Sequence, residues 1–404
     1  MIKGLPTLDD VECEGKNVLV RLDINSPIVN STILDTSRFE GHLPTLDELA
    51  DAKVVVTSHQ SRPGKKDFTT LESHAKVFSR ILGKNITYVD EMFSKRSIEE
   101  IDKMENGDVL LLENVRLYSE ERIDRSPESH SDSIMVNKLK GHFDIFVNDA
   151  FAACHRNNAS MVGFVPVVPS VGGRLIEKEV EALSTALHSK DRKVFILGGA
   201  KIKDSVKVME NVLTKNIAEK VVLTGVTAIY FHMLDGQDIG DNKEVVQENK
   251  EDIDNSKMKE LLEEYRDRVV LPVDYGVEVG GVRNDVPIEE LQGKIMDIGI
   301  NTISTLSEII PQYDIAVING PSGVFEDERF ALGTTEVLRS VSNAGFSIVG
   351  GGHISSAARI TGMDKKMDHI STGGSSCIRF LSGEDLIALE VIKDYWEKKW
   401  GINQ

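Results

Sequence analysis

The chain has 404 residues, of which 40% are hydrophobic, and its formal net charge at pH 7 is −18. This length exceeds one ordinary hydrophobic core, so we expect two domains. The negative charge disfavours general binding to nucleic acids or anionic membranes, because both need an extended basic surface. The three cysteines lie far apart in the sequence and match neither a disulfide framework nor a zinc site, which indicates a reducing, intracellular setting.

The first residues, Met-Ile-Lys-Gly-Leu-Pro, lack the apolar run of a signal peptide, and no stretch has the length of a membrane span. We therefore expect a soluble, cytoplasmic protein that is a monomer or a homodimer.

Short, β-branched apolar runs alternate with amphipathic helical patterns along most of the chain, which predicts parallel strands with helices on both faces of a sheet. The runs occupy 18–20, 54–56, 109–112 and 145–147 in the first half, and 194–197, 221–223, 269–271, 295–298, 315–318 and 347–349 in the second. The predicted fold class is α/β, with two Rossmann-like parallel-sheet domains.

The segment 164–173 interrupts this alternation with two prolines and a glycine pair, and a charged amphipathic helix pattern follows over 174–187. We place an N-terminal domain over 1–171 and a C-terminal domain over 172–383, separated by a cleft and joined by a hinge helix. The polar stretch 119–133 is predicted to be a mobile surface loop, and 235–255 to be peripheral. In the tail 384–404, Leu386, Leu389, Ile392, Trp396 and Trp400 share one helical face, so this helix must dock on the body of the protein.

Polar clusters follow each strand of the first half: Arg21-Leu-Asp23-Ile-Asn25, Ser58-His59-Gln-Ser-Arg62, Glu113-Asn-Val-Arg116, and Asp149 through Arg156. Ligands of parallel sheets gather beyond the carboxyl ends of the strands, so these clusters should share one edge. Three guanidinium groups, Arg62, Arg116 and Arg156, suit a phosphate. Asp23 and Asn25 alternate with apolar residues, which puts both on one side where they can bind a hydroxyl group. Together they predict a site for a small hydroxylated phosphate ester.

Glycines end the strands of the second half, at Gly198-Gly199, Asn319-Gly320, Gly350-Gly351-Gly352 and Gly373-Gly374. Such turns let backbone N–H groups approach phosphates, although neither a Walker A loop nor a G-x-G-x-x-G turn is present. The triple glycine carries most weight, because three residues without Cβ at a strand end would destabilise the fold unless close backbone approach is needed. The second half is predicted to bind a nucleotide, and Arg38 and Lys201 could supply positive charge for phosphoryl transfer.

Eight motifs, in order, resemble those of phosphoglycerate kinase over nearly the whole chain. They are Val20-Arg-Leu-Asp-Ile-Asn-Ser-Pro27, Ser58-His-Gln-Ser-Arg-Pro63, Leu112-Glu-Asn-Val-Arg116, Asp149-Ala-Phe-Ala-Ala-Cys-His-Arg156, Gly198-Gly-Ala-Lys201, Asn319-Gly-Pro-Ser-Gly-Val-Phe-Glu326, Gly350-Gly-Gly352 and Ser371-Thr-Gly-Gly374. The resemblance implies reversible phosphoryl transfer between 1,3-bisphosphoglycerate and ADP, giving 3-phosphoglycerate and ATP, with Mg²⁺, in glycolysis and gluconeogenesis. It also implies that the two domains close by a hinge and that the C-terminal helix returns to the N-terminal domain.

The resemblance further assigns roles by motif. It implies 3-phosphoglycerate binding by Asp23, Asn25, Arg38, His59, Arg62, Arg116 and Arg156. It implies catalytic roles for Arg38, Lys201, Gly373 and Gly374. It implies nucleotide binding by Gly199, Lys201, Asn319, Glu326, Gly350, Gly351, Gly352, His353 and Ile354.

Three departures from the common family pattern resemble its archaeal branch. Ser205 stands where many members have a second lysine, His353 where many have an aspartate that serves the magnesium nucleotide, and Ile318 where a tryptophan is common. The metal ligands are therefore left open, and Lys203 or Lys207 is a candidate to replace part of the missing charge.

Two other functions fit parts of the pattern. One is a kinase of a different small carboxylic acid, which would need another use for the arginine set. The other is an anion and nucleotide sensor of the same fold, which would have no use for transition-state donors such as Lys201. A coupled assay with 3-phosphoglycerate, ATP and other acids separates the three.

Overall fold

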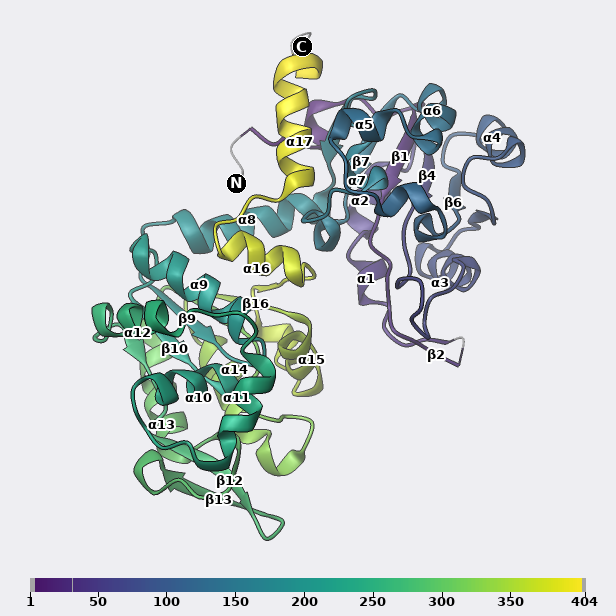
Figure 1. Ribbon diagram of the computed structural model, residues 1–404. Coiled ribbons are helices and arrows are strands. Elements are labelled where there is room, and N and C mark those ends of the chain that lie inside the picture. Colours follow the sequence, from purple (N-terminus) through teal and green to yellow (C-terminus); the bar gives the residue numbers. More distant parts are fainter. Residues whose placement is uncertain (1–3, 31, 402–404) are drawn as a thin grey trace. The chain divides into compact units, whose positions relative to one another are not determined.

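The computed structural model describes residues 4–30 and 32–401. The chain forms two compact units (Figure 1). Unit 1 comprises the described residues of Met1–Glu181 and Asp385–Gln404, and unit 2 comprises Ala182–Glu384. Within the described ranges, no helix combines the length and the apolar composition needed to cross a membrane.

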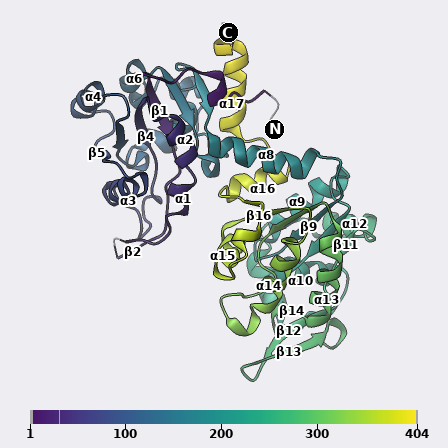
Figure 2. The ribbon, with the colours of Figure 1, turned by 180° about the vertical axis from the view of Figure 1, so that it is seen from behind.

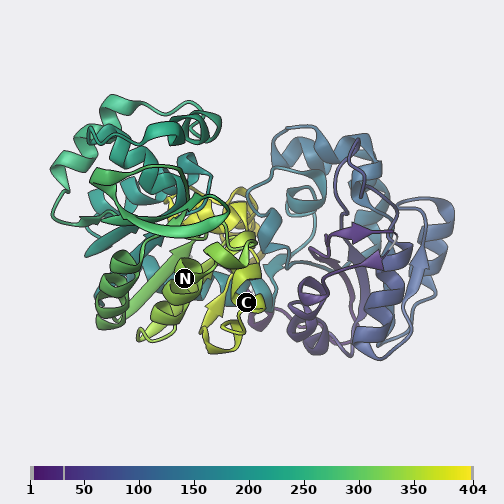
Figure 3. The same ribbon diagram turned by 90° about the horizontal axis from the view of Figure 1, so that it is seen from below.

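Unit 1 is built on a six-stranded parallel sheet in the order β5-β6-β4-β1-β7-β8. The strands are β1 (Asn17–Arg21), β4 (Lys53–Thr57), β5 (Thr87–Val89), β6 (Val109–Leu112), β7 (Ile145–Asn148) and β8 (Ser170–Gly172). A short hairpin joins β2 (Ile28–Val29) to β3 (Thr32–Ile33). The four runs predicted in this half are confirmed as β1, β4, β6 and β7. They read as continuous apolar runs because the sheet is covered on both faces (Figure 3).

The helices of unit 1 alternate with these strands. They are α1 (Ser37–Glu40), α2 (Leu43–Glu48), α3 (Glu72–Leu82), α4 (Lys95–Asp102), α5 (Pro127–Ser131), α6 (Ile134–Leu139), α7 (Ala159–Val162), α8 (Arg174–His188) and α17 (Ile387–Tyr395). The core between α1, α3 and the sheet contains Phe39 and Phe78, whose rings meet edge to face with centroids 5.6 Å apart. The division between the two units falls inside α8, between Glu181 and Ala182.

The C-terminal helix α17 belongs to unit 1 (Figure 1). Its backbone begins with a hydrogen bond from Ala388 N–H to the Cys154 carbonyl, 3.1 Å long. The predicted apolar face is buried at Leu386, Leu389 and Ile392. A π-helical turn follows over Trp396–Trp400, and the Trp400 indole donates to the Val165 carbonyl at 3.1 Å. The tail therefore docks on unit 1.

Unit 2 contains a second six-stranded parallel sheet in the order β11-β10-β9-β15-β16-β17. The strands are β9 (Lys193–Leu197), β10 (Lys220–Leu223), β11 (Val269–Val270), β15 (Ile315–Asn319), β16 (Phe346–Gly350) and β17 (His369–Ile370). In this sheet β10 and β11 extend from one side of β9 and the later strands from the other. The chain order therefore reverses between β9 and β15, which is the position where open α/β sheets bind ligands.

The run 295–298 was predicted as a further parallel strand, and this is wrong. It is β14 (Lys294–Ile298), which pairs antiparallel with β12 (Asp274–Val279) in a separate three-stranded sheet completed by β13 (Val282–Pro287). Ile298, the last residue of β14, lies in a buried cluster with residues of α13 (Ile300–Ile309) and α14 (Leu332–Val341), and Figure 2 shows β14 beside α14. An apolar run indicates that a strand is buried but not in which direction it runs. Strand β13 is polar and mostly exposed, so no pattern in the sequence predicts it.

The helices of unit 2 are α9 (Ile202–Thr214), α10 (Gly225–Leu234), α11 (Lys243–Asn249), α12 (Asn255–Glu264), α13 (Ile300–Ile309), α14 (Leu332–Val341), α15 (Gly352–Ile360) and α16 (Ser375–Leu381). One segment predicted as a surface loop contains a helix instead: residues 119–133 include α5 and the buried Glu121 and His130. Residues 235–255, predicted to be peripheral, include α11, whose Val246 is fully buried.

The buried imidazole of His74 in α3 makes the stability of unit 1 depend on pH. Its Nε2 lies 3.0 Å from the Gln60 side-chain oxygen, and burial lowers the pKa of His74 to about 4. Because the folded state favours the neutral ring, this contribution to stability is complete above the unfolded pKa and is lost as the pH falls through 6.5 towards 4. We expect the wild type to lose about 2 kcal/mol more of its free energy of unfolding between pH 7 and pH 5 than His74→Gln, which does not titrate.

Urea titrations followed by tryptophan fluorescence test this, because both tryptophans, Trp396 and Trp400, belong to unit 1. Equal pH dependence in the two proteins would show that His74 does not resist protonation.

Candidate active site

The four polar clusters of unit 1 follow neighbouring strands. In the order β6-β4-β1-β7 all four strands are parallel, so their carboxyl ends lie at one sheet edge. The residues that follow these ends include Glu113, Ser58, Leu22 and Asp149. The predicted common edge is therefore present, and it gathers side chains that are more than 100 residues apart in the sequence.

Asp23 is the negative centre of this edge. Its Oδ2 accepts from Arg38 Nη1 at 2.6 Å, and its Oδ1 accepts from the Asn25 backbone N–H at 3.1 Å. Burial by itself would raise the pKa of Asp23, but Arg38, His59 and Arg21 lower it well below the ordinary value. The Arg38 side chain is 30% exposed whereas that of Asp23 is 7% exposed. The Arg38 guanidinium group can therefore contact a ligand while the Asp23 carboxylate keeps that guanidinium group in place.

A group of cations surrounds His59. Arg21, the last residue of β1, is 1% exposed, and its Nη2 lies 3.1 Å from His59 Nδ1. Burial, and after it the positive charges of Arg21, Arg116 and Arg156, lower the pKa of His59 well below its usual range. Burial and then Arg156 and Arg21 likewise lower the pKa of Arg116 to about 10. These shifts show that the cations crowd together, as a site for a doubly charged anion requires.

The loop after β4 carries the remaining predicted residues. Asn25 Oδ1 accepts from Ser61 N–H at 2.8 Å, and Arg116 donates to the Ser61 carbonyl. Arg62, next in the chain, is exposed, as is Arg156. Ser61 has a φ of 53°, so the backbone is turned sharply at the residue before Arg62.

Supporting residues of this edge were not predicted as site residues. Arg21 Nε donates to Ser160 Oγ at 2.9 Å, and Ser160 Oγ in turn donates to Glu121 Oε1 at 2.8 Å. Glu121 lies in the segment predicted as a surface loop, and its partner Ser160 lies 39 residues away. The signal that could have found Arg21 is its place at the end of an apolar strand, where a charge must have partners.

Unit 2 contains a cavity of about 510 Å³ at the reversal of strand order. Seven of the nine predicted nucleotide residues line it: Gly199, Lys201, Asn319, Gly351, Gly352, His353 and Ile354. The predicted catalytic Gly374 also lines it, together with residues not predicted as part of the site, among them Asp204, Asn249 and Ser375. The remaining predicted residues, Gly350, Glu326 and Gly373, are not part of this lining. Glu326 is exposed in a turn, and Gly350 is the last residue of β16.

Three helices begin at this cavity. They are α9 after Lys201, α15 at Gly352 and α16 after Gly374. Their first N–H groups have no partner within the helix, so they can bind anionic oxygens. Gly351 and Gly374 adopt φ angles of 97° and 48°, which the backbone needs in order to turn into α15 and α16. A Cβ at Gly352 would meet no atom within 4 Å, so space is left there for a ligand.

The side-chain amide of Asn319 is a second indication that this cavity binds a ligand. Its side-chain Nδ2 is buried, lines the cavity with the rest of the residue, and makes no hydrogen bond with any described residue. Leaving such a donor unsatisfied costs about 1–3 kcal/mol, so a buried amide of this kind is expected to meet an acceptor when the site is filled. Phosphate oxygens would satisfy it.

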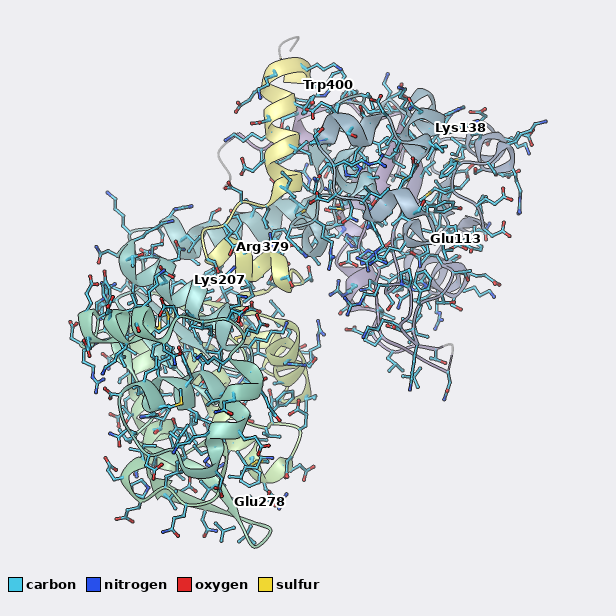
Figure 4. All side chains as sticks on the ribbon, in the orientation of Figure 1. Glu113, Lys138, Lys207, Glu278, Arg379 and Trp400 are labelled. Atoms are coloured by element: carbon cyan, nitrogen blue, oxygen red, sulfur yellow. The ribbon has the colours of Figure 1, made fainter. Side chains whose placement is uncertain are left out.

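The two lysines proposed to replace the missing charge at Ser205 pair with carboxylates elsewhere. Lys203 Nζ lies 3.2 Å from Glu251 and Lys207 Nζ lies 2.6 Å from Glu384, a carboxylate that Arg379 also approaches (Figure 4). Neither is among the lining residues of the cavity. Among those residues Lys201 is the one lysine, and its side chain is 79% exposed. No cluster of three or more His, Cys, Asp or Glu that could hold a metal occurs in the described part of the chain.

Comparison with known proteins matches these features to one family. The family model described as phosphoglycerate kinase matches residues 8–384. The chain belongs to the phosphoglycerate kinase family. It is 63% identical over 404 residues to phosphoglycerate kinase of Archaeoglobus fulgidus, with 99% of each chain covered, and 45% identical over 408 residues to that of Methanococcus maripaludis, with 97% and 99% covered. The crystal structure of phosphoglycerate kinase from Pyrococcus horikoshii OT3 is 36% identical, with a TM-score of 0.89 and with 98% of this chain and 100% of that chain covered.

Membership of the phosphoglycerate kinase family confirms that the protein is a glycolytic kinase, and a nucleotide, ATP or ADP, is one of its substrates. It also decides against the sensor and against a kinase of an unrelated acid. The resemblance to the archaeal branch is confirmed as well, since archaeal members are among the most similar relatives.

The open space at Gly352 gives a direct test of the nucleotide cavity. Gly352→Leu should leave thermal stability almost unchanged, because its Cβ meets no neighbouring atom, but the side chain would enter the cavity. We expect its affinity for ATP, measured by isothermal titration calorimetry, to fall about tenfold or more.

The matched control is Gly141→Leu in unit 1, where a Cβ also meets nothing within 4 Å. This control should bind ATP as the wild type does. Normal ATP affinity in Gly352→Leu would place the nucleotide elsewhere.

Proposed function

We propose that the enzyme transfers the γ-phosphoryl group of ATP reversibly to the carboxylate of 3-phosphoglycerate. A carboxylate oxygen of the acid attacks the γ-phosphorus, and the bond from that phosphorus to the β–γ bridging oxygen breaks. The products are 1,3-bisphosphoglycerate and ADP, and the glycolytic direction is the reverse. The observation that carries this proposal is the concentration of cations at one sheet edge of unit 1 in a chain of net charge −18.

In unit 1, the exposed Arg62 and Arg156 would bind the phosphate of the acid together with Arg116 and His59. Asp23 and Asn25 would bind its hydroxyl group, because they present oxygen acceptors beside this cation group. The acid's carboxylate would then lie towards Arg38. A doubly charged phosphate offsets the mutual repulsion of these cations, which adds to burial in lowering the pKa of His59 and Arg116.

In unit 2, the first turns of α15 and α16 would hold the nucleotide phosphates through backbone N–H groups, and the Asn319 amide would donate to a phosphate oxygen. Lys201 would follow the phosphoryl group during transfer, since its side chain is 79% exposed and its Asp204 partner is 4.0 Å away. Glu326 would bind the ribose hydroxyls. Catalysis would thus rest on positioning and on charge stabilisation by Arg38, Lys201 and the N–H groups at Gly373 and Gly374.

Mg²⁺ would be bound together with the nucleotide. The cavity lining offers oxygen ligands at Asp204 and Ser205, but the described residues contain no three-ligand cage. This fits a cation that keeps most of its water and binds through one carboxylate and substrate phosphates. When bound, the ion would neutralise charge on the phosphate oxygens.

Arg38→Ala should lower kcat about 100-fold or more, because it removes one donor to the transition state. A coupled assay measuring NADH oxidation with 3-phosphoglycerate and ATP gives kcat and KM. Arg38→Lys keeps the positive charge but lacks the planar guanidinium group, so its kcat should lie between those of the wild type and Arg38→Ala. If Arg38→Ala raised only the KM and left kcat unchanged, Arg38 would serve in substrate binding alone.

We further infer domain closure, since each substrate is assigned to a different unit and the reacting atoms must meet. Small-angle scattering should show a smaller radius of gyration with 3-phosphoglycerate and ATP together than with either alone. Gly352→Leu, which is expected to bind ATP more weakly, is the control: at an ATP concentration just sufficient for the wild type it should compact much less. No change in the wild type with both ligands would contradict closure as a step of the reaction.

A further inference from the structure

His42 lies immediately before α2, and its buried ring joins the acid site to the interior of unit 1. Its Nδ1 is 2.7 Å from Asp149 Oδ2, and the Asp23 backbone N–H donates to its Nε2 at 3.1 Å. The side chains of His42 and Asp149 are 1% and 0% exposed. Because a carboxylate oxygen can only accept, Nδ1 carries a proton. Nε2 meets the backbone of Asp23, whose carbonyl oxygen also lies 3.3 Å away.

Asp149 is a fixed anchor for this ring. Its Oδ2 also accepts from Thr45 Oγ1 at 2.9 Å, and its Oδ1 accepts from the first N–H groups of α8, those of Leu175 at 2.9 Å and Ile176 at 3.3 Å. A Cβ at Gly173 would lie 2.3 Å from Oδ1, so glycine is required there for the carboxylate to reach the helix. The position of Asp149 is therefore set by packing as well as by four donors.

Asp23 lies beyond the end of β1, where regular strand pairing no longer fixes the backbone. The neighbouring Leu22 N–H still donates to the Thr57 carbonyl of β4, whereas the Asp23 N–H donates to His42 instead. The Asp23 carboxylate holds Arg38 at 2.6 Å. His42 thus controls the backbone from which the Asp23–Arg38 pair projects, although the ring itself is buried.

We propose that His42 is a positioning residue for the acid substrate: it holds the Asp23–Arg38 pair in place by tying the Asp23 backbone to Asp149 and so to the first turn of α8. This inference rests on the proposed function, which assigns Asp23 and Arg38 to 3-phosphoglycerate. It requires no contact between His42 and the substrate.

Two substitutions of His42 test its hydrogen bond to Asp23 and its hydrogen bond to Asp149 separately. The amide of glutamine reaches about as far as Nε2, so His42→Gln can still accept from the Asp23 N–H. The shorter amide of asparagine lies near Nδ1, so His42→Asn can still donate to Asp149 but loses Asp23. We expect His42→Asn to raise the KM for 3-phosphoglycerate about tenfold, on the scale of one lost buried hydrogen bond, and to change the KM for ATP less than about twofold. His42→Gln keeps the bond to Asp23 but loses the bond to Asp149, so it should raise the KM for 3-phosphoglycerate by less than His42→Asn does and leave the KM for ATP unchanged.

Thermal unfolding of both variants is measured alongside. If the KM for 3-phosphoglycerate followed only the loss of stability, or if both variants raised the KM for ATP equally, His42 would be a packing residue and the proposal would be wrong.

The wild type offers a test that does not depend on a variant. Two-bond ¹⁵N–¹H spectra of protein labelled at histidine should show a proton on Nδ1 of His42, whose signal is assigned by its absence in His42→Gln. Adding 3-phosphoglycerate should shift this signal, and adding ATP should not. An unchanged signal with saturating 3-phosphoglycerate would contradict a link between His42 and the acid site.

Arg62→Ala distinguishes failure of this inference from failure of the proposed function. If Arg62→Ala raises the KM for 3-phosphoglycerate and His42→Asn does not, the proposed acid site is supported and the positioning role of His42 is wrong. If neither changes that KM, the acid is bound elsewhere and both proposals fall.

Discussion

The common direction of the strands is the constraint on which the rest of the structure depends. In a parallel sheet the carboxyl ends of all strands lie at the same edge, and at this edge the chain leaves the apolar core. In unit 1 that edge receives charged side chains, and in unit 2 it receives glycines. The same architecture therefore supports two different ways of binding a phosphorylated ligand, one through side-chain charges and one through the backbone.

Burying charge at the first edge is costly, and the partners of Arg21 show how the fold offsets the cost. Arg21 lies among Ser160, His59 and the Leu22 carbonyl, and the nearby carboxylates of Glu121 and Asp23 balance its charge. These partners come from segments distant in the sequence. The electrostatic arrangement is thus available only after the sheet and its connecting segments have assembled, which makes the acid site a product of tertiary structure.

The sequence predicted the structure well where a run of one residue type has one main structural explanation. Four apolar runs predicted β1, β4, β6 and β7, because short, continuously apolar, β-branched runs are typical of the buried strands of a sheet covered on both faces. The glycines at 350–352 predicted a ligand cavity for a similar reason. The sequence was uninformative where a residue depends on partners. Glu121 lies in a polar stretch typical of a loop, and nothing local in the sequence distinguishes it from its half-buried neighbour Glu120.

The same limit explains why the antiparallel sheet and His42 were missed. Strand β13 is polar and mostly exposed, so it has neither the alternation nor the apolar run of a predicted strand. His42 is one histidine before a short helix, and its role depends on Asp149, which lies 107 residues later. Motif spacing predicted residues that lie together at the sheet edge of unit 1 and in the cavity of unit 2. The residues that support them from behind have no fixed spacing in the sequence.

The departure at Ser205 shows how the two modes of phosphate binding differ in what they tolerate. The Ser205 hydroxyl donates to the Gly198 carbonyl at 3.3 Å, so at this position a side chain supports the glycine turn and carries no charge. Lys201 is the one lysine in the cavity lining, so under the proposed function much of the attraction for phosphate would come from the starts of α9, α15 and α16. Backbone N–H groups are set by the fold and are removed only by substitution with proline. Each cation at the edge of unit 1 is instead a single side chain, which any one substitution can remove. Binding through the backbone therefore depends less on the side chain at a position such as 205 than binding through guanidinium groups depends on each arginine.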